Sequence, residues 1–172
     1  VSNGVVVTTS GNYAVDFTSS AKYLVNETFN NSTAISSVFT LIKSASSSGT
    51  QIITDSTDSS TRQVSGYYGA GPSVFNIFKG IVTRSQTPHN TNLNLLSTFF
   101  DVKSDLYLNG VKIIDTLNAG TNNRQGFTLG SGIDGVVPFN GSIFEVIIFD
   151  EQNKSSDRVG IETNINTHYT IY

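Results

Sequence analysis

The 172-residue chain contains no cysteine, no methionine and no tryptophan, and only 13% of its residues are charged. Without cysteine, no disulfide can hold the fold together, although this leaves the cellular compartment open. A chain of this length buries roughly 70% of the surface of its unfolded state, which is enough for a core without a metal. We therefore expect residues 1–172 to form one domain, and nothing in the sequence indicates a cofactor.

Long basic runs and long apolar runs are also missing. The net charge of −3 and the lack of any basic cluster argue against nucleic acids and anionic membranes as partners. No apolar stretch approaches the ~20 residues of a membrane-spanning helix, and no signal peptide is recognisable. Because the chain starts at Val1, we expect a processed product or a part of a longer protein.

Serine, threonine and asparagine supply about a third of the residues. Surfaces built from hydroxyls and amides, instead of lysine and glutamate, are usual in exported adhesins, fibres and lectins. We therefore expect an extracellular, cell-surface or virion protein. A genome rich in A and T is the alternative explanation of the same composition.

The clearest local pattern is a hairpin over residues 105–115. Its centre, Asn109-Gly110, tolerates the positive φ angles of a two-residue type I′ turn, whose twist matches that of the flanking strands. Pairing outward from this turn puts four apolar side chains on one face and Tyr107 and Lys112 on the other. The side chains expected in the core are Leu106, Leu108, Val111 and Ile113.

A second pattern runs over residues 139–150, where a glycine precedes a nearly continuous apolar strand. Such a strand is typical of burial on both faces. One strand pair buried on one face and one strand buried on both indicate a two-layer β-sandwich. The other expected strands lie at residues 5–8, 13–17, 22–25, 37–43, 51–54, 62–68, 74–78, 93–100 and 127–130.

Two further segments complete the chain. Residues 81–92, which include Pro88 and His89, are the least regular part, and we assign no strand to them. Residues 155–169 are the one helical candidate, because a serine can cap the start and apolar positions recur every three or four residues. The side chains on this stripe are Arg158, Ile161, Ile165 and Tyr169.

Five stretches occur in an order that resembles a known family. They are YAVDFTSSAKYLV (13–25), SVFTLIKS (37–44), NLLSTFFDVKSDLYLNGV (94–111), FTLGS (127–131) and residues 139–171, which begin FNGSIFEVIIFDE. The set resembles the concanavalin A-like superfamily, specifically its laminin-G-like branch. The resemblance implies an all-β fold, an antiparallel two-sheet jelly-roll sandwich with one short C-terminal helix. The chain departs from the family in lacking the common tryptophan before the hairpin strand.

The resemblance also implies a function. It points to a non-catalytic, lectin-like carbohydrate-recognition domain that binds a surface polysaccharide or other glycan, as in bacterial surface proteins and phage virion appendages. A structural or decoration module that binds a protein partner in a larger assembly is the alternative. A groove lined with tyrosine and asparagine favours the glycan, whereas a flat apolar patch above a few hundred Å² favours the protein partner.

Catalytic residues are not indicated. Glucanases of the superfamily carry alternating acidic residues on one strand, so that the carboxylates project into one cleft. Here Glu145 is the nearest candidate, but its companions on the strand are isoleucines. We expect no enzyme, and we expect Glu145 to pair with a backbone or basic group where the helix covers the sheet. A Ser-His-Asp arrangement could use only His89 or His168, and no motif supports it.

Calcium is the metal to consider, because laminin-G-like domains sometimes bind it at the rim. A hard cation requires several oxygen ligands from neighbouring loops. Asp101, Asp105 and Asp134 are at plausible positions, yet none belongs to a D-x-D or similar cluster. We expect solvated turn aspartates and no metal site.

Glycan binding requires an aromatic face for stacking beside amides and hydroxyls. Tyr67 and Tyr68 are adjacent in an expected strand, so one ring should lie in the core and the other on the surface. Asn122, Asn123 and Arg124 offer donors in a polar loop. We predict that one of the tyrosines and this loop form the carbohydrate site. A cross-strand aromatic and an ordinary turn are the alternative interpretations.

Overall fold

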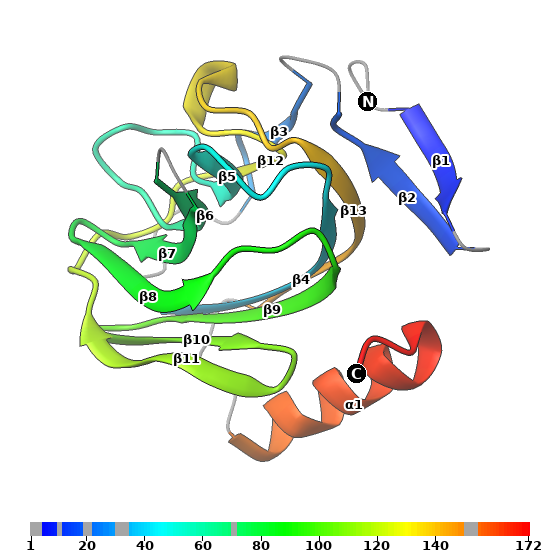
Figure 1. Ribbon diagram of the computed structural model, residues 1–172. Coiled ribbons are helices and arrows are strands. Elements are labelled where there is room, and N and C mark those ends of the chain that lie inside the picture. Colours follow the sequence, from blue (N-terminus) through cyan, green and yellow to red (C-terminus); the bar gives the residue numbers. More distant parts are fainter. Residues whose placement is uncertain (1–4, 10–11, 19–21, 30–34, 70–71, 150–154) are drawn as a thin grey trace.

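The computed structural model describes residues 5–9, 12–18, 22–29, 35–69, 72–149 and 155–172. Within them, two antiparallel sheets pack face to face and one α-helix lies against the outer side of the larger sheet (Figure 1). The seven-stranded sheet has the order β1 (Val5–Thr9), β2 (Asn12–Asp16), β13 (Gly141–Phe149), β4 (Ser36–Ser44), β9 (Leu93–Phe100), β10 (Lys103–Leu108) and β11 (Val111–Asn118). The six-stranded sheet has the order β3 (Leu24–Asn26), β12 (Phe127–Leu129), β5 (Gln51–Asp55), β6 (Val64–Tyr68), β7 (Val74–Phe78) and β8 (Val82–Pro88).

The sandwich expected from the sequence is therefore confirmed. Each strand predicted from the local pattern is present, and its ends differ from the prediction by at most three residues. The predicted helix is α1 (Ser155–Tyr169), and a short 3-10 turn, η1 (Ile133–Gly135), lies between β12 and β13. No helix in the described part of the chain is long and apolar enough to cross a membrane.

The main core lies between the two sheets. Alternate side chains of neighbouring strands point inward and meet across the sandwich. Burial of each large apolar side chain contributes roughly 1.5–3 kcal/mol. The large buried side chains of this core are Phe17, Val38, Ile42, Ile53, Tyr67, Phe75, Ile77, Leu96, Phe100, Leu106, Ile114, Phe139 and Ile143.

A second apolar cluster lies between the seven-stranded sheet and α1. Ile165 is buried at its centre, and Ile161 and Tyr169 of the predicted stripe pack around it. The face also holds the buried carboxylate of Glu162, which accepts a hydrogen bond from Ser97 Oγ at 2.7 Å and pairs with Arg158. The pattern of apolar residues did not indicate this ion pair.

β13 runs between both clusters, which confirms that the strand is buried on both faces. A register shift against β4 between Ile143 and Glu145 inserts one extra residue. A bulge of this kind re-aims a side chain, and Glu145 points toward α1. The side chains packed on the main core are Ile143, Val146 and Ile148, and those packed on the helix side are Phe144, Ile147 and Phe149.

The hairpin between β10 and β11 has the predicted turn, but the pairing of its two strands differs from the predicted register. Asn109 and Gly110 have φ angles of 50° and 78°, as a type I′ turn requires. Leu106 is buried, but it lies opposite Ile114 instead of Ile113 because the ladder shifts between Leu106 and its neighbours. The prediction that Val111 is in the core is wrong: this side chain is 66% exposed.

Leu108 and Ile113, the other two predicted core residues of the hairpin, are only partly buried against the core. Tyr107 faces α1, where the guanidinium of Arg158 lies 4.0 Å from its ring centroid. Lys112 pairs with Asp105 at 3.2 Å. The predicted division of the hairpin into two faces therefore holds for Leu106, Tyr107 and Lys112.

β8 forms within the segment that we expected to be irregular. It is an edge strand paired with β7, and it ends at Pro88, where the missing N–H is tolerated. Thr83 and Ser85 point inward and are buried, whereas Val82 and Arg84 are exposed. Because the inward positions carry hydroxyls instead of apolar groups, the alternation of hydropathy that marks a strand is absent.

Candidate functional site

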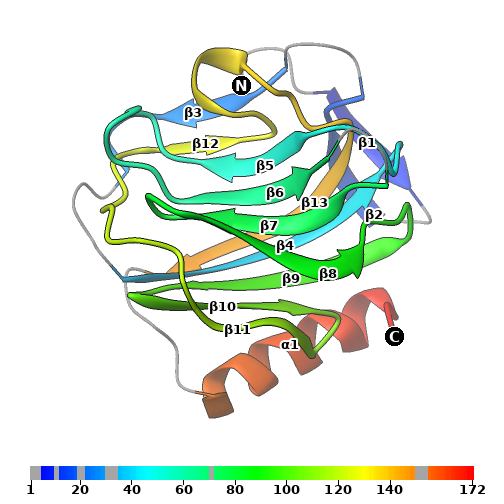
Figure 2. The same ribbon diagram turned by 60° about the vertical axis from the view of Figure 1, so that its left-hand side comes forward.

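The outer face of the six-stranded sheet is the candidate site. Figure 2 shows this sheet face-on, in front of the seven-stranded sheet whose own outer face carries α1. A hollow of about 230 Å³ opens on it. The hollow is lined by residues of β5, β6, β7 and β8 and of the adjoining loops: Thr50, Ile52, Arg62, Val64, Tyr67, Tyr68, Asn76, Phe78 and Val82.

Strand pairing explains why these residues gather. Gly66 of β6 lies opposite both Ile52 of β5 and Asn76 of β7, and Phe78 lies between Val64 and Val82. Residues opposite each other in neighbouring strands point to the same face. The hollow therefore combines an apolar lining with a few polar groups, which is the composition of small-molecule sites.

Tyr68 lies at the end of β6 and is 43% exposed. One face of its ring is covered by the guanidinium of Arg84, whose Cζ lies 3.8 Å from the ring centroid. Arg84 is directly opposite Asn76 in the sheet, so the Tyr68 side chain reaches across β7 to meet it. Such a stacked pair holds both long side chains in place.

Asn76 carries the central polar group of the hollow. The residue is nine-tenths buried, yet no hydrogen bond joins its amide to any other side chain or backbone group in the described part of the chain. Buried polar groups are normally hydrogen-bonded. The amide is therefore free to bind a ligand that enters the hollow.

Arg62 lies at the other end of the hollow and is held by Asp55. Its Nε donates to Asp55 Oδ1 at 3.1 Å, and its Nη2 bonds Oδ2. The carboxylate of Asp55 is fully buried and also accepts from the backbone N–H groups of Ser56 and Ile133. The charge of Arg62 is therefore balanced within the protein.

The predicted site residues do not come together. Tyr67 and Tyr68 do point to opposite faces, as expected, and the ring of Tyr67 is in the core. Arg124 is also buried, 5.2 Å from the ring of Phe29, so it does not present donors on the surface. These two residues are corrections, because both side chains are enclosed by packing that the local pattern does not show.

The loop of Asn122 and Asn123 lies at the opposite end of β6 from Tyr68. The carbonyl of Asn122 accepts a hydrogen bond from Gln63, which directly precedes β6, at 3.4 Å. Tyr68 lies five positions after Gln63 along the strand, a distance of roughly 16 Å. Tyr67 and Tyr68 line the hollow but the loop of residues 122–124 does not, so the joint site of Tyr68 with the loop is not formed.

The sequence alone did not identify three residues of this face as candidates for the site. Arg84 lies in β8, which has no apolar alternation, and Asn76 interrupts an apolar strand without a motif around it. Arg62 was included in an expected strand, but nothing marked it as part of a site. Their proximity arises from pairing between strands, so only the sheet order reveals it.

The region of His89 is part of the interior. Its ring stacks on Tyr67 with 3.3 Å between centroids and an angle of 12°, and Ser73 Oγ lies 3.1 Å from its Nδ1. Burial lowers the pKa of His89 to about 4 and raises the pKa of the Tyr67 hydroxyl well above its usual value. Because Ser73 is fully buried, this serine–histidine pair has no access to a substrate.

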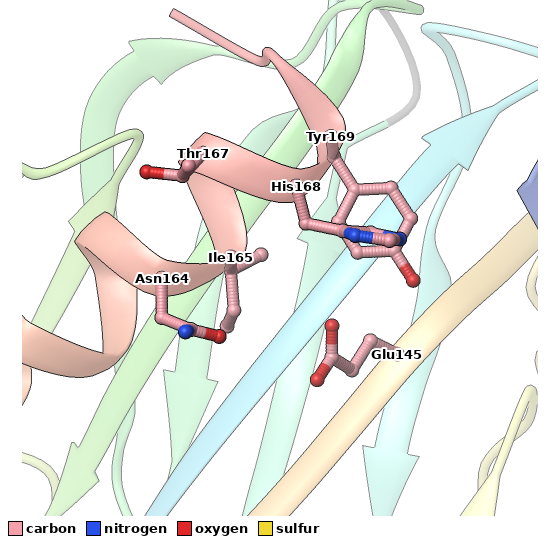
Figure 3. A pocket seen from close by; sticks show the side chains of 6 residues that line it. All are labelled: Glu145, Asn164, Ile165, Thr167, His168 and Tyr169. Carbon is pink, nitrogen blue, oxygen red and sulfur yellow. The ribbon is translucent and has the colours of Figure 1, made fainter.

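A second concavity, of about 570 Å³, lies between α1 and β13 (Figure 3). Glu145 projects into it toward His168 and Tyr169. The expected pairing of Glu145 with a backbone or basic group is not found among the described residues. Burial, and secondly the charge of Glu145, raise the pKa of Tyr169. Among the described residues that line this concavity Glu145 is the one carboxylate, whereas glycoside hydrolysis uses two.

The aspartates considered for calcium are dispersed. Asp105 pairs with Lys112, and Asp101 accepts a hydrogen bond from the following backbone N–H at 2.6 Å. The side chain of Asp134 lies outside the described part of the structure. No group of three or more His, Asp or Glu side chains that could hold a metal occurs among the described residues.

No family model and no curated protein sequence matches the chain. Solved structures do match. Domain 4 of AbnA, a GH43 extracellular arabinanase from Geobacillus stearothermophilus, in complex with arabinotriose, has a TM-score of 0.67 and 14% identity, with 94% of this chain and 82% of that chain covered. A putative carbohydrate-binding protein from Bacteroides ovatus has a TM-score of 0.65 and 17% identity, with 78% and 42% covered.

The ligand-binding domain of botulinum neurotoxin serotype D, in complex with N-acetylneuraminic acid, has a TM-score of 0.66 and 16% identity, with 92% of this chain and 44% of that chain covered. The chain thus spans less than half the length of the second and third of these proteins. At such low identity the likeness concerns the fold, and it confirms that this chain is a jelly-roll β-sandwich.

Proposed function

We propose that this chain is a non-catalytic, lectin-like carbohydrate-binding domain and that the hollow on the six-stranded sheet is its binding site. The observation that carries the proposal is the exposed ring of Tyr68 beside the amide of Asn76, which bonds no described residue. An aromatic ring can stack on the C–H face of a sugar, and an amide can both donate to and accept from sugar hydroxyls. The hydroxyl of Thr50 adds a further polar group to the lining.

Three proteins of similar structure support the proposal, because each is linked to a carbohydrate. One is in complex with arabinotriose, one is a putative carbohydrate-binding protein, and one is in complex with N-acetylneuraminic acid. The ordered motifs that resemble the concanavalin A-like superfamily and its laminin-G-like branch support the same function. The lining of tyrosine, asparagine and threonine favours a glycan over a flat protein interface.

The proposed function is non-catalytic because the described residues of neither concavity include the two carboxyl groups that a glycosidase uses. Such enzymes use a pair of carboxyl groups about 5–10 Å apart across the scissile bond. The described residues that line the hollow include no Asp or Glu, and those that line the concavity beside α1 include only Glu145. A binding role requires neither.

We further propose an extracellular setting, on a cell surface or as part of a virion appendage. The composition supports it: serine, threonine and asparagine make up about a third of the chain, and cysteine is absent. Hydroxyl-rich and amide-rich surfaces are usual in exported recognition proteins.

The test is a glycan array with the whole chain, followed by calorimetric titration of the best ligand. We expect Tyr68→Ala to weaken binding at least about tenfold, which corresponds to about 1.4 kcal/mol. Tyr13→Ala is the matched control, because Tyr13 is also exposed (74%) but lies on the other sheet. Both variants should keep the melting temperature of the wild type.

Two results would contradict the proposal. One is a wild-type chain that binds no glycan on an array containing neutral and acidic polysaccharides. The other is equal loss of binding in the two tyrosine variants, which would place the glycan away from the hollow. Lack of glycan binding combined with a protein partner that protects Tyr68 from solvent would favour the decoration module instead.

A further inference from the structure

Arg84 is the one arginine of this face whose charge is not balanced by the described residues. Arg62, at the other end of the hollow, is paired with the buried carboxylate of Asp55. Arg84 is exposed, and its contact within the described part of the chain is with the ring of Tyr68. Because the described residues that line the hollow include no Asp or Glu, none of them offsets the positive charge of Arg84 next to Tyr68.

Stacking on Tyr68 prepares the guanidinium for a ligand. An arginine held against a ring face keeps its N–H groups directed outward in its own plane. Restricting this long side chain before a ligand arrives lowers the entropy lost on binding. The donors of Arg84 are thus oriented, adjacent to the ring on which a sugar would stack, and not bonded to any described residue.

We propose that the hollow selects an anionic sugar residue, whose carboxylate or sulfate group is bound by Arg84 while its ring packs on Tyr68. This inference rests on the proposed function. A guanidinium binds such oxyanions through two parallel N–H···O bonds, which are stronger than bonds between neutral groups. The pyranose hydroxyls then face Asn76, which lies directly opposite Arg84 in the sheet.

The experiment compares ligands that differ only in charge. The probes are a sialylated oligosaccharide and its desialylated form, a uronic-acid oligosaccharide and its carboxyl-reduced form, and a sulfated oligosaccharide and its desulfated form. Affinities are measured for the wild type, for Arg84→Gln and for Lys43→Gln. The last variant removes the same charge from an exposed position on the seven-stranded sheet.

We expect the wild type to prefer the anionic member of at least one pair. Arg84→Gln should weaken binding of that member by about 10- to 100-fold, as for loss of a charge-assisted hydrogen bond, and should leave the neutral member within about twofold. Lys43→Gln should retain the preference. Preference in the carboxylate pairs alone identifies a carboxylate ligand, and preference in the sulfated pair alone identifies a sulfate ligand.

Other outcomes overturn the inference and separate it from the proposed function. If the wild type binds neutral and anionic members equally, the charge selectivity is wrong and the glycan-binding function stands. If Arg84→Gln weakens both members equally, Arg84 only holds Tyr68 in place, and the inference fails. If no member of any pair binds, the proposed function fails together with the inference.

Discussion

Acid should destabilise this fold through His89, which lies between the two sheets at 4% exposure. The ring stacks on Tyr67, and its Nδ1 lies 3.1 Å from Ser73 Oγ. Its Nε2 has no hydrogen-bond partner among the described residues. A proton added there creates a buried charge without a partner, so burial lowers the pKa of His89 to about 4.

The magnitude follows from linkage. The pKa of an unfolded histidine is about 6.5, so the depression of roughly 2.5 units corresponds to about 3 kcal/mol. Because the folded-state pKa is the lower one, this contribution is fully present above pH 6.5. It is lost progressively as the pH falls from about 6.5 to about 4, where the unfolded chain takes up a proton that the folded chain does not.

The assay is urea unfolding at several pH values between 7.5 and 4, applied to the wild type and to His89→Phe. Phenylalanine keeps a ring against Tyr67 but does not titrate, so the variant should lose less free energy of unfolding on acidification than the wild type. His168→Phe is the matched control, because His168 is exposed on α1. An equal pH dependence in the wild type and His89→Phe would refute the reasoning.

Three further predictions concern stability and are checked by chemical unfolding. Leu106→Ala should lower the free energy of unfolding by about 2–5 kcal/mol, since the side chain is buried, whereas Val111→Ala should change it by less than about 0.5 kcal/mol. Gly130→Ala should destabilise strongly, because φ is +82° and the new Cβ would overlap the ring of Phe17. Glu162→Ala should lower the free energy of unfolding by about 3 kcal/mol, because the substitution leaves the mostly buried Arg158 without its carboxylate. Equal stability of the Leu106 and Val111 variants would contradict the packing described. A wild-type free energy of unfolding for the Gly130 or Glu162 variant would contradict it as well.

Part of the candidate site could be predicted from the sequence. Adjacent residues of a strand face opposite sides, so one of Tyr67 and Tyr68 had to be on the surface. Which of them is exposed depends on how β6 pairs with β5 and β7, and that is decided by residues distant in the chain. Arg124 shows the same limit, because a polar loop residue becomes buried when the loop packs against another segment.

The amino-acid sequence by itself determined the local elements. Asn109-Gly110 specify a turn because few other residues adopt two successive positive φ angles, and the apolar run of β13 specifies a strand buried on both faces. Local sterics and hydropathy act over a few residues, so they can be recognised without the rest of the chain. The helix was predictable for the same reason.

Only the tertiary structure decided which residues become neighbours. The register shift in the hairpin puts Ile114 opposite Leu106 in the core, whereas Val111 of the same strand pairs with Leu108 as expected and is nevertheless exposed. The hollow exists because β6, β7 and β8 are neighbours, which brings Tyr68, Asn76 and Arg84 together from separate segments. Pairing between strands joins residues far apart in the chain, and its free energy depends on the packing of the whole sandwich. No local pattern carries that information.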